Sequence, residues 1–429
     1  MDSSTNSPRA QHIAILLPSL AGGGAERSML HLARSFTEQG REVDLLLFRT
    51  KGAYMNSVPE SVRVIELEAG SSVGGRLLAA QADPAGIGVL LKPVLLPFKV
   101  DSSIRHINAL TRYMETQRPD VILSALTYTN LAALWAKRLS RIKIPVIVSE
   151  RIALSVHLQR EKSRHRWRSR FMLPMVERTY RFADGIVAVS DDVANDLAGS
   201  AHIDRNTITT IYNPVVDSTL PELAALPLDH PWFSPGQPPV ILGVGRLTPQ
   251  KDFHTLLRTF ALLRGEKDIR LVILGEGQQR AELAALAKEL GVSADVDMPG
   301  FVDNPYQYMA RAAVFALTSL YEGLPGVIIQ ALACGCPVVS TDCPGGSAEI
   351  LENGKYGRLV PVQHNRELAD AIRLTLDSSP DPEQLKARAA LFSTDNATRQ
   401  YLDLMENIAS HTKPEIAFTA DANRNAESS

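Results

Sequence analysis

The sequence predicts an α/β protein with two doubly wound, Rossmann-like domains, each a parallel sheet covered by helices and facing its partner across a central cleft. Two observations predict this class: short apolar runs alternate with helix-length amphipathic segments, and the alternation restarts after a proline-rich stretch. At 429 residues the chain exceeds one ordinary domain, and its 45% hydrophobic content can fill two large cores.

The first half opens with the apolar run HIAILLP (12–18), a predicted strand, followed by the glycine loop Gly22–Gly24. Residues 25–39 carry apolar side chains at helical spacing, Gly40 ends that helix, and EVDLLLF (42–48) is the next strand. This is a βαβ unit with a glycine turn at its first crossover. Further strands are predicted at 121–126, 145–150, 185–190 and 208–214.

The second half follows the proline-rich residues 217–239, which predict an inter-domain connection. Strands are predicted at 240–245, 270–275, 313–318 and 337–340, with helices from about Phe253, over 278–290 and after Pro325. The predicted organisation is a disordered N-terminus (1–10), a first domain (11–216), a second domain (217–395), a helix crossing back to the first domain (396–410) and a disordered tail (411–429).

Charge and cysteine content exclude several classes of protein. A formal net charge of −2 argues against a general nucleic-acid binder. The three cysteines, Cys334, Cys336 and Cys343, lie close together, but no histidine is near them, which favours small buried residues over a metal site. The absence of a disulfide framework and of a signal peptide predicts a cytoplasmic setting.

The segment Glu322–Val339, EGLPGVIIQALACGCPVV, is the most informative part of the chain. An acid lies in a Gly/Pro loop that leads into an apolar helix, and Gln330 follows a little over two helical turns later, so both side chains can face one crevice. Glycine lets backbone approach a ligand, and helix N-termini bind anions. The segment suits a sugar, a diphosphate and a ribose, although such turns also occur as plain connections.

Cations and glycines follow the first strand of each half. Arg246 and Lys251, in GRLTPQKDF (245–253), can reach one anionic group from a strand end. Gly22–Gly24 lacks the spacing of a nicotinamide fingerprint or a P-loop, which leaves either a backbone surface for a diphosphate or a tight turn without a ligand. Asp295-Val296-Asp297 matches a D-x-D metal pattern, but solvated carboxylates at a turn are the favoured interpretation.

The strip Leu158–Arg181 holds seven arginines and one lysine against two glutamates, with aromatic and apolar residues between them. Such a strip suits an anionic membrane face or a lipid-linked phosphate. A solvated helix whose charge is balanced by neighbouring acids is an equal alternative.

Taken together, the motifs resemble the retaining glycosyltransferases of family 4 (glycosyl transferases group 1), which have the GT-B fold. The resemblance rests on GGGAER (22–27), VGRLTPQKDF (244–253), LGEG (274–277), GFVDNPY (300–306), EGLPGVIIQALACGCPVVSTDCPGG (322–346) and EIL (349–351). These segments span nearly the whole folded chain, and the second-domain block is the more specific.

The resemblance implies a role for each matching residue. Arg246 and Lys251 would bind the donor diphosphate and stabilise the leaving nucleotide, and Glu322 would contact the donor sugar. Gly23 and Gly24 would approach the donor from the first domain. Sugar and phosphates would be supported by the backbone of Leu324, Pro325, Gly326 and Val327. No metal or other cofactor is expected.

Two positions depart from the family pattern. The residue that binds the ribose hydroxyls is normally a second Glu and here is Gln330, which keeps an acceptor and adds donors. Many members carry a His after the strand equivalent to PVIVSE, where this chain has Ser149-Glu150-Arg151. Glu150, Thr127 and Asn130 are the candidates for polar groups near the acceptor.

The predicted function is transfer of a sugar, with retention, from a nucleotide diphosphate donor to an acceptor hydroxyl. The GGGAER opening and the CPGG-x2-EIL ending resemble members that assemble surface polysaccharides or lipid-linked glycans. That favours a UDP-sugar donor and a glycan or polyprenyl-linked acceptor at the inner face of the cytoplasmic membrane. A catalytically silent nucleotide-sugar-binding homologue and a sugar-nucleotide epimerase are the alternatives.

Overall fold

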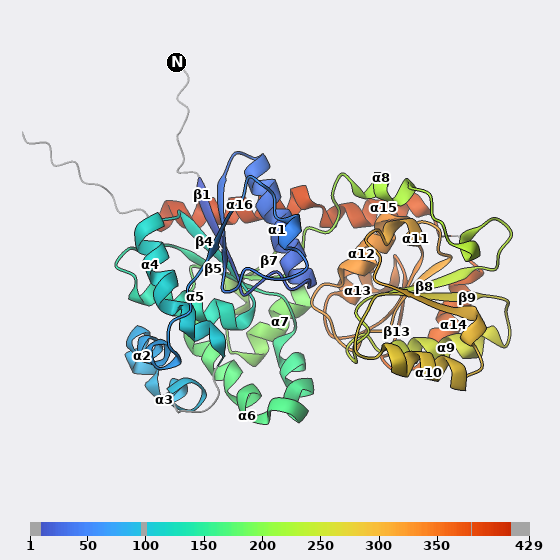
Figure 1. Ribbon diagram of the computed structural model, residues 1–429, viewed down its shortest axis with the longest axis horizontal. Coiled ribbons are helices and arrows are strands. Elements are labelled where there is room, and N and C mark those ends of the chain that lie inside the picture. Colours follow the sequence, from blue (N-terminus) through green and yellow to red (C-terminus); the bar gives the residue numbers. More distant parts are fainter. Residues whose placement is uncertain (1–9, 96–100, 379, 413–429) are drawn as a thin grey trace, which may run out of the picture.

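The computed structural model describes residues 10–95, 101–378 and 380–412, and their side chains apart from residues 157, 160–170, 411 and 412. Two α/β domains lie side by side (Figure 1). The terminal segments predicted to be disordered fall largely outside the described residues.

The first domain contains a seven-stranded parallel sheet of order β3-β2-β1-β4-β5-β6-β7. Its strands are β1 (His12–Leu17), β2 (Glu42–Leu47), β3 (Arg63–Glu66), β4 (Val121–Ala125), β5 (Val146–Glu150), β6 (Gly185–Ala188) and β7 (Ile208–Thr210). The strand order reverses between β1 and β4, and ligands of open parallel sheets bind at the carboxyl ends beside such a reversal.

The second domain repeats this plan with six parallel strands in the order β10-β9-β8-β11-β12-β13. They are β8 (Val240–Val244), β9 (Arg270–Leu274), β10 (Val296–Gly300), β11 (Val314–Leu317), β12 (Val338–Thr341) and β13 (Arg358–Val360). Here the order reverses between β8 and β11. The loops that follow these two strands carry the GRLTPQKDF and EGLPG motifs, so the topology brings them together.

Helices cover both faces of each sheet, as continuous apolar parallel strands require. In the first half they are α1 (Gly24–Glu38), α2 (Ser72–Ala82), α3 (Ile87–Leu90), α4 (Ile107–Gln117), α5 (Thr127–Leu139), α6 (Leu154–Tyr180) and α7 (Asp191–Ser200). In the second half they are α8 (Leu220–Ala225), α9 (Phe253–Arg264), α10 (Arg280–Glu289), α11 (Tyr306–Met309), α12 (Gly326–Ala333), α13 (Ser347–Ile350), α14 (Asn365–Leu376), α15 (Pro382–Ala389) and α16 (Thr394–Thr412).

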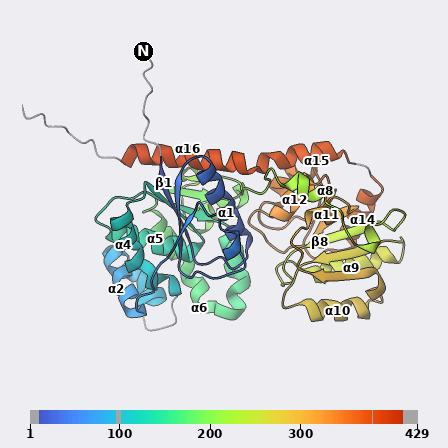
Figure 2. The ribbon, with the colours of Figure 1, turned by 45° about the horizontal axis from the view of Figure 1, so that its top comes forward.

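The last helix, α16, belongs to the core of the first domain. Ala397, Tyr401 and Met405 are buried against one face of the first sheet together with Phe36 of α1. Figure 2 shows α15 and α16 following each other along one side of the molecule, over the second domain and then the first. The chain therefore crosses between the domains twice.

The two crossings pair with each other. Val216 and Ser393 form an isolated parallel bridge. The amide of Val215 donates to the carbonyl of Phe392 (3.0 Å), and that of Thr394 donates to the carbonyl of Val216 (2.9 Å). This paired segment connects the domains at one point and leaves the carboxyl ends of the two sheets to face each other.

Candidate active site

The centre of the candidate site is a lysine–glutamate pair between the loops that follow β8 and β11. Lys251 Nζ lies 2.5 Å from Glu322 Oε1, and Ser319 Oγ donates to the same oxygen at 2.6 Å. Both charged side chains are largely buried, with 15% and 10% exposed. The sequence predicted Lys251 and Glu322 from separate motifs, and the fold brings them into contact.

Backbone and side-chain bonds join these two loops. Gln250 Nε2 donates to the carbonyl of Tyr321 (2.9 Å), and Thr318 Oγ1 donates to the carbonyl of Lys251 (2.9 Å). Leu320 N donates to the carbonyl of Gln250 (2.8 Å). The cation and the acid are therefore held in fixed relation before any ligand arrives, which is the preorganisation that electrostatic catalysis needs.

Arg246 lies at the start of the same loop and is exposed. Within the described part of the chain its side chain forms no ion pair. Its fork of donors is thus available to an anionic ligand, whereas the charge of Lys251 is already shared with Glu322.

The backbone of the EGLPG loop runs into α12, whose N-cap, Pro325, makes no side-chain cap bond. The first amides of a helix lack intrahelical partners, so Gly326 and Val327 present N–H groups there. Pro325 has no N–H, and its carbonyl accepts a bond from Ile328 N (3.0 Å). Of the predicted donor-binding backbone, Leu324, Gly326 and Val327 can donate, while Pro325 fixes the turn.

The glycine loop of the first domain leads into α1. Gly22 has a φ of +104°, a left-handed conformation that side chains rarely adopt. Gly23 is the N-cap of α1, again without a side-chain cap, while the carboxylate of Glu26 lies so close to Gly23 that a Cβ there would be 2.4 Å from Oε2. An acid thus covers the N-terminus that was predicted to face a diphosphate, and Gly24 beside it is open, with no atom within 4 Å of a built Cβ.

The two domains touch directly at the EGLPG loop. A Cβ on Gly323 would lie 2.0 Å from the carbonyl oxygen of Arg151, at the end of β5. Ser190 Oγ donates to the carbonyl of Gly323 (3.2 Å), and Asp191 N donates to Glu349 Oε2 (2.9 Å). Glycine at 323 is therefore what allows the second domain to approach the first this closely.

Gln330 faces a tyrosine instead of open solvent. Its side chain is buried, and Nε2 lies 3.4 Å from the hydroxyl of Tyr306 on α11. The same hydroxyl accepts a bond from Arg27 Nη2 of α1 in the other domain (2.9 Å).

The predicted acceptor-side residues come together, but in a buried network. Thr127 Oγ1 donates to Glu150 Oε2 (3.0 Å), and Asn130 Nδ2 donates to the carbonyl of Ser149 (3.1 Å) and the hydroxyl of Tyr180 (3.0 Å). Tyr180 also donates to Glu150. Burial raises the pKa of Glu150 to about 7, against the lowering effect of these hydrogen bonds. These hydrogen bonds hold the carboxyl end of β5 against α5 and α6.

Arg151 is a buried cation of the site to which the sequence motifs assign no role. It is 8% exposed, and its Nε and Nη2 have no hydrogen-bond partner within the described residues. Burial lowers its pKa. An unsatisfied buried cation costs stability, so its presence at the end of β5 calls for a ligand. The signal in the sequence was a cation directly after Glu150, at the carboxyl end of a strand that begins as an apolar run.

Other clusters have structural explanations. Asp295 pairs with Arg264 (2.7 Å) and Arg270 (2.8 Å), and Asp297 with His230 (3.0 Å), so the D-x-D motif is occupied by protein partners. The three cysteines are free thiols whose pKa values burial raises.

One group of potential metal ligands exists among the described residues: His12, Glu42 and Asp44. Both oxygens of Asp44 already accept bonds from Arg63, at 2.7 and 2.6 Å, and Tyr113 adds another at 2.6 Å. The group is therefore a satisfied polar cluster of the sheet. Within the same described residues, every helix is too short or too polar to cross a lipid bilayer.

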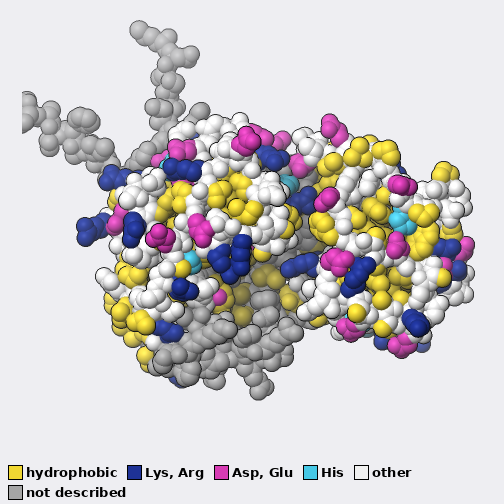
Figure 3. All heavy atoms as spheres, viewed as in Figure 1, with side chains coloured by type: hydrophobic (Ala, Val, Ile, Leu, Met, Phe, Trp, Pro, Cys, Tyr) yellow, Lys and Arg dark blue, Asp and Glu magenta, His cyan; other side chains and the backbone are white. Residues whose placement is uncertain are grey.

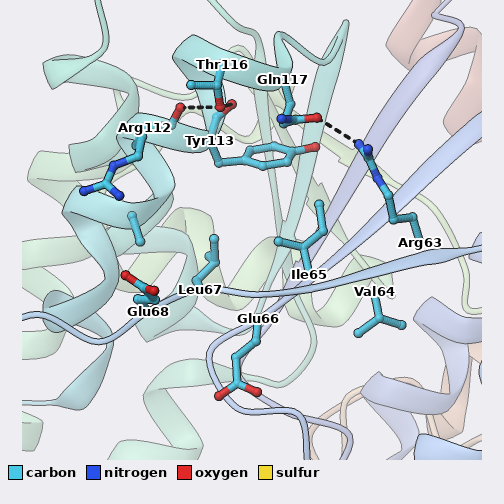
Figure 4. Close-up of a pocket in the computed structure, with 11 residues that line it drawn as sticks. Arg63, Val64, Ile65, Glu66, Leu67, Glu68, Arg112, Tyr113, Thr116 and Gln117 are labelled. Carbon is cyan, nitrogen blue, oxygen red and sulfur yellow. Dashed lines mark hydrogen bonds between the residues drawn. The ribbon is translucent and has the colours of Figure 1, made fainter.

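A hollow of about 420 Å³ lies on the outer edge of the first domain, between β3 and α4 (Figure 4). Its lining comes from residues 63–68 and from 109–117. Arg63 and Gln117 are hydrogen bonded across it at 3.2 Å. Because the second domain contributes nothing to its lining, this hollow is separate from the candidate site.

Comparison with known families decides the class. The model of glycosyl transferases group 1 matches residues 229–392, and that of Glycosyltransferase Family 4 matches residues 22–218. The chain belongs to this glycosyltransferase family. The two models cover the two domains in turn, so the resemblance predicted from the motifs is confirmed.

Relatives extend the match along the whole enzyme. The glycosyltransferase is 28% identical over 383 residues to the N-acetylgalactosamine-N,N'-diacetylbacillosaminyl-diphospho-undecaprenol 4-alpha-N-acetylgalactosaminyltransferase of Campylobacter jejuni, covering 88% of this chain and 94% of that one. It is 33% identical over 177 residues to the lipopolysaccharide core biosynthesis glycosyltransferase LpsE of Rhizobium meliloti, covering 40% and 51% of the two chains.

Solved structures confirm the GT-B fold. The lipopolysaccharide outer core galactosyltransferase WaaB superposes with a TM-score of 0.67 at 18% identity, over 92% of this chain and 99% of that one. Anabaena Alr3699/HepE in complex with UDP gives 0.66 at 19% identity, over 92% and 100%. The predicted two-domain, Rossmann-like architecture is thus confirmed.

Proposed function

We propose that this glycosyltransferase transfers a sugar, with retention, from a UDP-sugar to a hydroxyl of a polyprenyl-linked glycan at the inner face of the cytoplasmic membrane. The observation that carries the proposal is the preorganised Lys251–Glu322 pair beside the exposed Arg246 and the free amides of α12. Together they offer two cations and a row of donors to a diphosphate, and a carboxylate to sugar hydroxyls.

For this reaction the protein must position the two substrates and stabilise the charge that develops. As the bond between the sugar and the diphosphate breaks, negative charge develops on the leaving nucleotide, and Lys251 and Arg246 are placed to stabilise it. Glu322 can accept hydrogen bonds from the sugar hydroxyls, and Ser319 holds its carboxylate in place (2.6 Å). The leaving phosphate oxygen accepts the proton of the incoming hydroxyl on the same face of the sugar, which gives retention without a protein nucleophile or metal.

Arg151 supports a place for the donor between the domains. It belongs to the segment Ser149-Glu150-Arg151, which stands where many members of the family carry a histidine near the reacting sugar, and two of its nitrogens have no protein partner among the described residues. A donor phosphate or sugar oxygen in this place would satisfy them.

Support for a lipid-linked acceptor comes from the relatives and from one surface. The Campylobacter relative is named for an undecaprenol-linked substrate. Val73 and Leu77 of α2 are 68% and 67% exposed, and Ile87 and Leu91 at α3 are 44% and 45% exposed. Figure 3 shows hydrophobic side chains gathered where Figure 1 places α2 and α3. The helix α3 packs against α6, which carries the basic strip Leu158–Arg181; the side chains of 160–170 within that strip are outside the described ones.

The donor is tested by thermal shift of the purified protein with UDP, GDP, ADP and NAD at millimolar concentration. A ligand at 100 times its Kd adds roughly 2.7 kcal/mol to the free energy of unfolding. Selective stabilisation by UDP, lost in Lys251→Ala, is the expected result. Stabilisation by GDP or ADP alone would overturn the UDP assignment, and no response to any diphosphate would favour a silent homologue.

Transfer itself is tested with radiolabelled UDP-sugars and a polyprenyl diphosphate-linked saccharide in detergent. The expected result is release of UDP together with label in the lipid-linked product, and an α linkage from an α donor. An epimerase would isomerise the donor without releasing UDP. A silent binding protein would bind UDP and release nothing, and Gln330→Glu would be the variant to test for recovered transfer.

A further inference from the structure

The side chain of Gln330 contacts a tyrosine, which is contacted in turn by an arginine of the other domain. These two residues, Tyr306 and Arg27, are the last residues of the GFVDNPY and GGGAER segments, and no role has been assigned to them so far. Tyr306 begins α11, Gln330 lies in α12, and Arg27 lies on α1 of the first domain. The hydroxyl of Tyr306 is 2.9 Å from Arg27 Nη2 and 3.4 Å from Gln330 Nε2.

The donors and acceptors of Arg27, Tyr306 and Gln330 determine which groups remain for a ligand. Arginine can only donate, so the hydroxyl oxygen of Tyr306 accepts from Arg27. The hydroxyl proton is then free to be donated, and a bond from a cation makes the hydroxyl a stronger donor to its next partner. Gln330 can meet this hydroxyl through its nitrogen or, with the amide turned over, through its oxygen, and the other end of the amide remains for a ligand.

Burial makes this contact specific. Tyr306 is 4% exposed and Gln330 9% exposed, so the amide has few orientations available and loses little freedom when a ligand binds. Tyr306 is fixed in turn by its own amide, which donates to Asn304 Oδ1 at 3.1 Å. Four residues along α1 from Arg27, His31 faces Asp217 of the connecting segment (3.8 Å), so this side of α1 lies against the interdomain connection.

We propose that Tyr306 and Arg27 are positioning residues that orient the amide of Gln330 toward the ribose hydroxyls of the donor. The inference rests on the proposed function, in which Gln330 contacts the ribose. It adds that recognition of the ribose, a property of the second domain, depends on a residue of the first domain. It also explains how the amide of Gln330 can bind the ribose in place of a glutamate. The hydrogen bond from Arg27 polarises the hydroxyl of Tyr306, and that hydroxyl holds the amide in the orientation that binding needs.

The test is discrimination between ribose and deoxyribose. Dissociation constants of UDP, 2'-deoxy-UDP and 3'-deoxy-UDP are measured by calorimetry for the wild type, Gln330→Ala, Tyr306→Phe and Arg27→Met. One hydrogen bond of ordinary strength corresponds to about a tenfold preference. The wild type is expected to prefer UDP over at least one deoxy analogue by about that factor. In all three variants the preference is expected to fall to within about twofold of unity.

Matched controls separate orientation from folding. Tyr308→Phe removes a hydroxyl two residues away on α11. The ring of Tyr308 packs against that of Phe233, with 5.5 Å between the ring centroids. Arg34→Met removes an exposed arginine from the same helix as Arg27. Both are expected to keep the wild-type preference. If Tyr306→Phe does not fold, Arg27→Met carries the test, because Arg27 is only partly buried.

The outcomes distinguish this inference from the proposed function. If no nucleoside diphosphate binds the wild type, the proposed function fails and the inference with it. If UDP binds and the preference for ribose is unchanged in Tyr306→Phe and Arg27→Met, the proposed function stands and the inference is overturned. A wild type that binds UDP and its deoxy analogues equally also overturns it. Should GDP be the nucleotide bound, the same comparison is made with GDP and its analogues.

Discussion

Gly323→Ala places a methyl group where the two domains meet. The new Cβ would lie 2.0 Å from the carbonyl oxygen of Arg151 and 2.9 Å from its carbonyl carbon, whereas ordinary van der Waals contact begins near 3.4 Å. Both opposing atoms are backbone, so no side-chain rotation can relieve the overlap. The domains must separate by more than roughly 1 Å at this point, and misplacement of that size costs on the order of 100-fold in rate.

The substitution acts next to Glu322 but leaves the rest of the second domain unchanged. We therefore expect kcat/KM to fall about 100-fold, equivalent to about 2.7 kcal/mol of transition-state stabilisation. The affinity for UDP should fall by less than the rate, because Lys251, Arg246 and the α12 amides belong to the second domain, and only the contacts proposed for Arg151 and Arg27 come from the first. The thermal unfolding temperature should also change little, since opening the interface relieves the overlap without disturbing either core.

The assays are initial rates of UDP release with a lipid-linked acceptor, calorimetric binding of UDP, and thermal unfolding. Gly265→Ala at the end of α9 is the control, because its Cβ would meet backbone oxygens at 3.5 and 3.9 Å only. A Gly323→Ala enzyme that turns over at the wild-type rate would refute the argument that this close approach is needed for transfer.

Three further predictions concern buried charges. Lys251→Met should lower UDP affinity and, by leaving Glu322 without its partner, cost about 3 kcal/mol of stability; Lys251→Met/Glu322→Gln should restore the stability measured by chemical denaturation but not the affinity. The pKa of Glu150 is raised to about 7 from 4.5, so the folded chain holds a proton that the unfolded chain has lost, and the free energy of unfolding should fall as pH rises from about 4.5 to 7. Glu150→Gln should remove this slope and be more stable by about 3 kcal/mol at pH 8, and an unchanged slope in denaturation at several pH values would contradict the assignment. Arg151→Met should unfold at the wild-type temperature or above, because two nitrogens of the buried cation have no partner among the described residues, yet lose at least about tenfold in turnover; undiminished turnover would show that Arg151 is not needed for transfer.

The apolar strands in the interior of each sheet could be predicted from the sequence, whereas of the four edge strands only β7 was, within 208–214. HIAILLP and EVDLLLF lie in β1 and β2, buried between helices on both faces, so their composition alone marks them. The strands β3, β10 and β13 were not predicted. Each lies at an edge of its sheet, and RVIE in β3 has no buried residue, so it lacks the continuous apolar run.

The same division holds for the candidate site. Lys251 and Glu322 could be predicted because each lies within one short motif, GRLTPQKDF or EGLPG, whose neighbouring residues mark it. Partners that only folding brings together leave no local signal. Arg27 and Tyr306 are 279 residues apart in sequence, and Arg151 meets Gly323 only because the two sheets face each other. No spacing rule predicts such contacts.

The placement of α16 has a consequence for synthesis on the ribosome. The second sheet uses one continuous stretch of chain, between residues 240 and 360, whereas the first requires Tyr401, Leu402 and Met405 to close its core. Domains usually fold in the order in which they emerge. In this chain the order of completion is reversed: the domain that begins first must wait, with one apolar face of its sheet partly uncovered, until the second has left the exit tunnel.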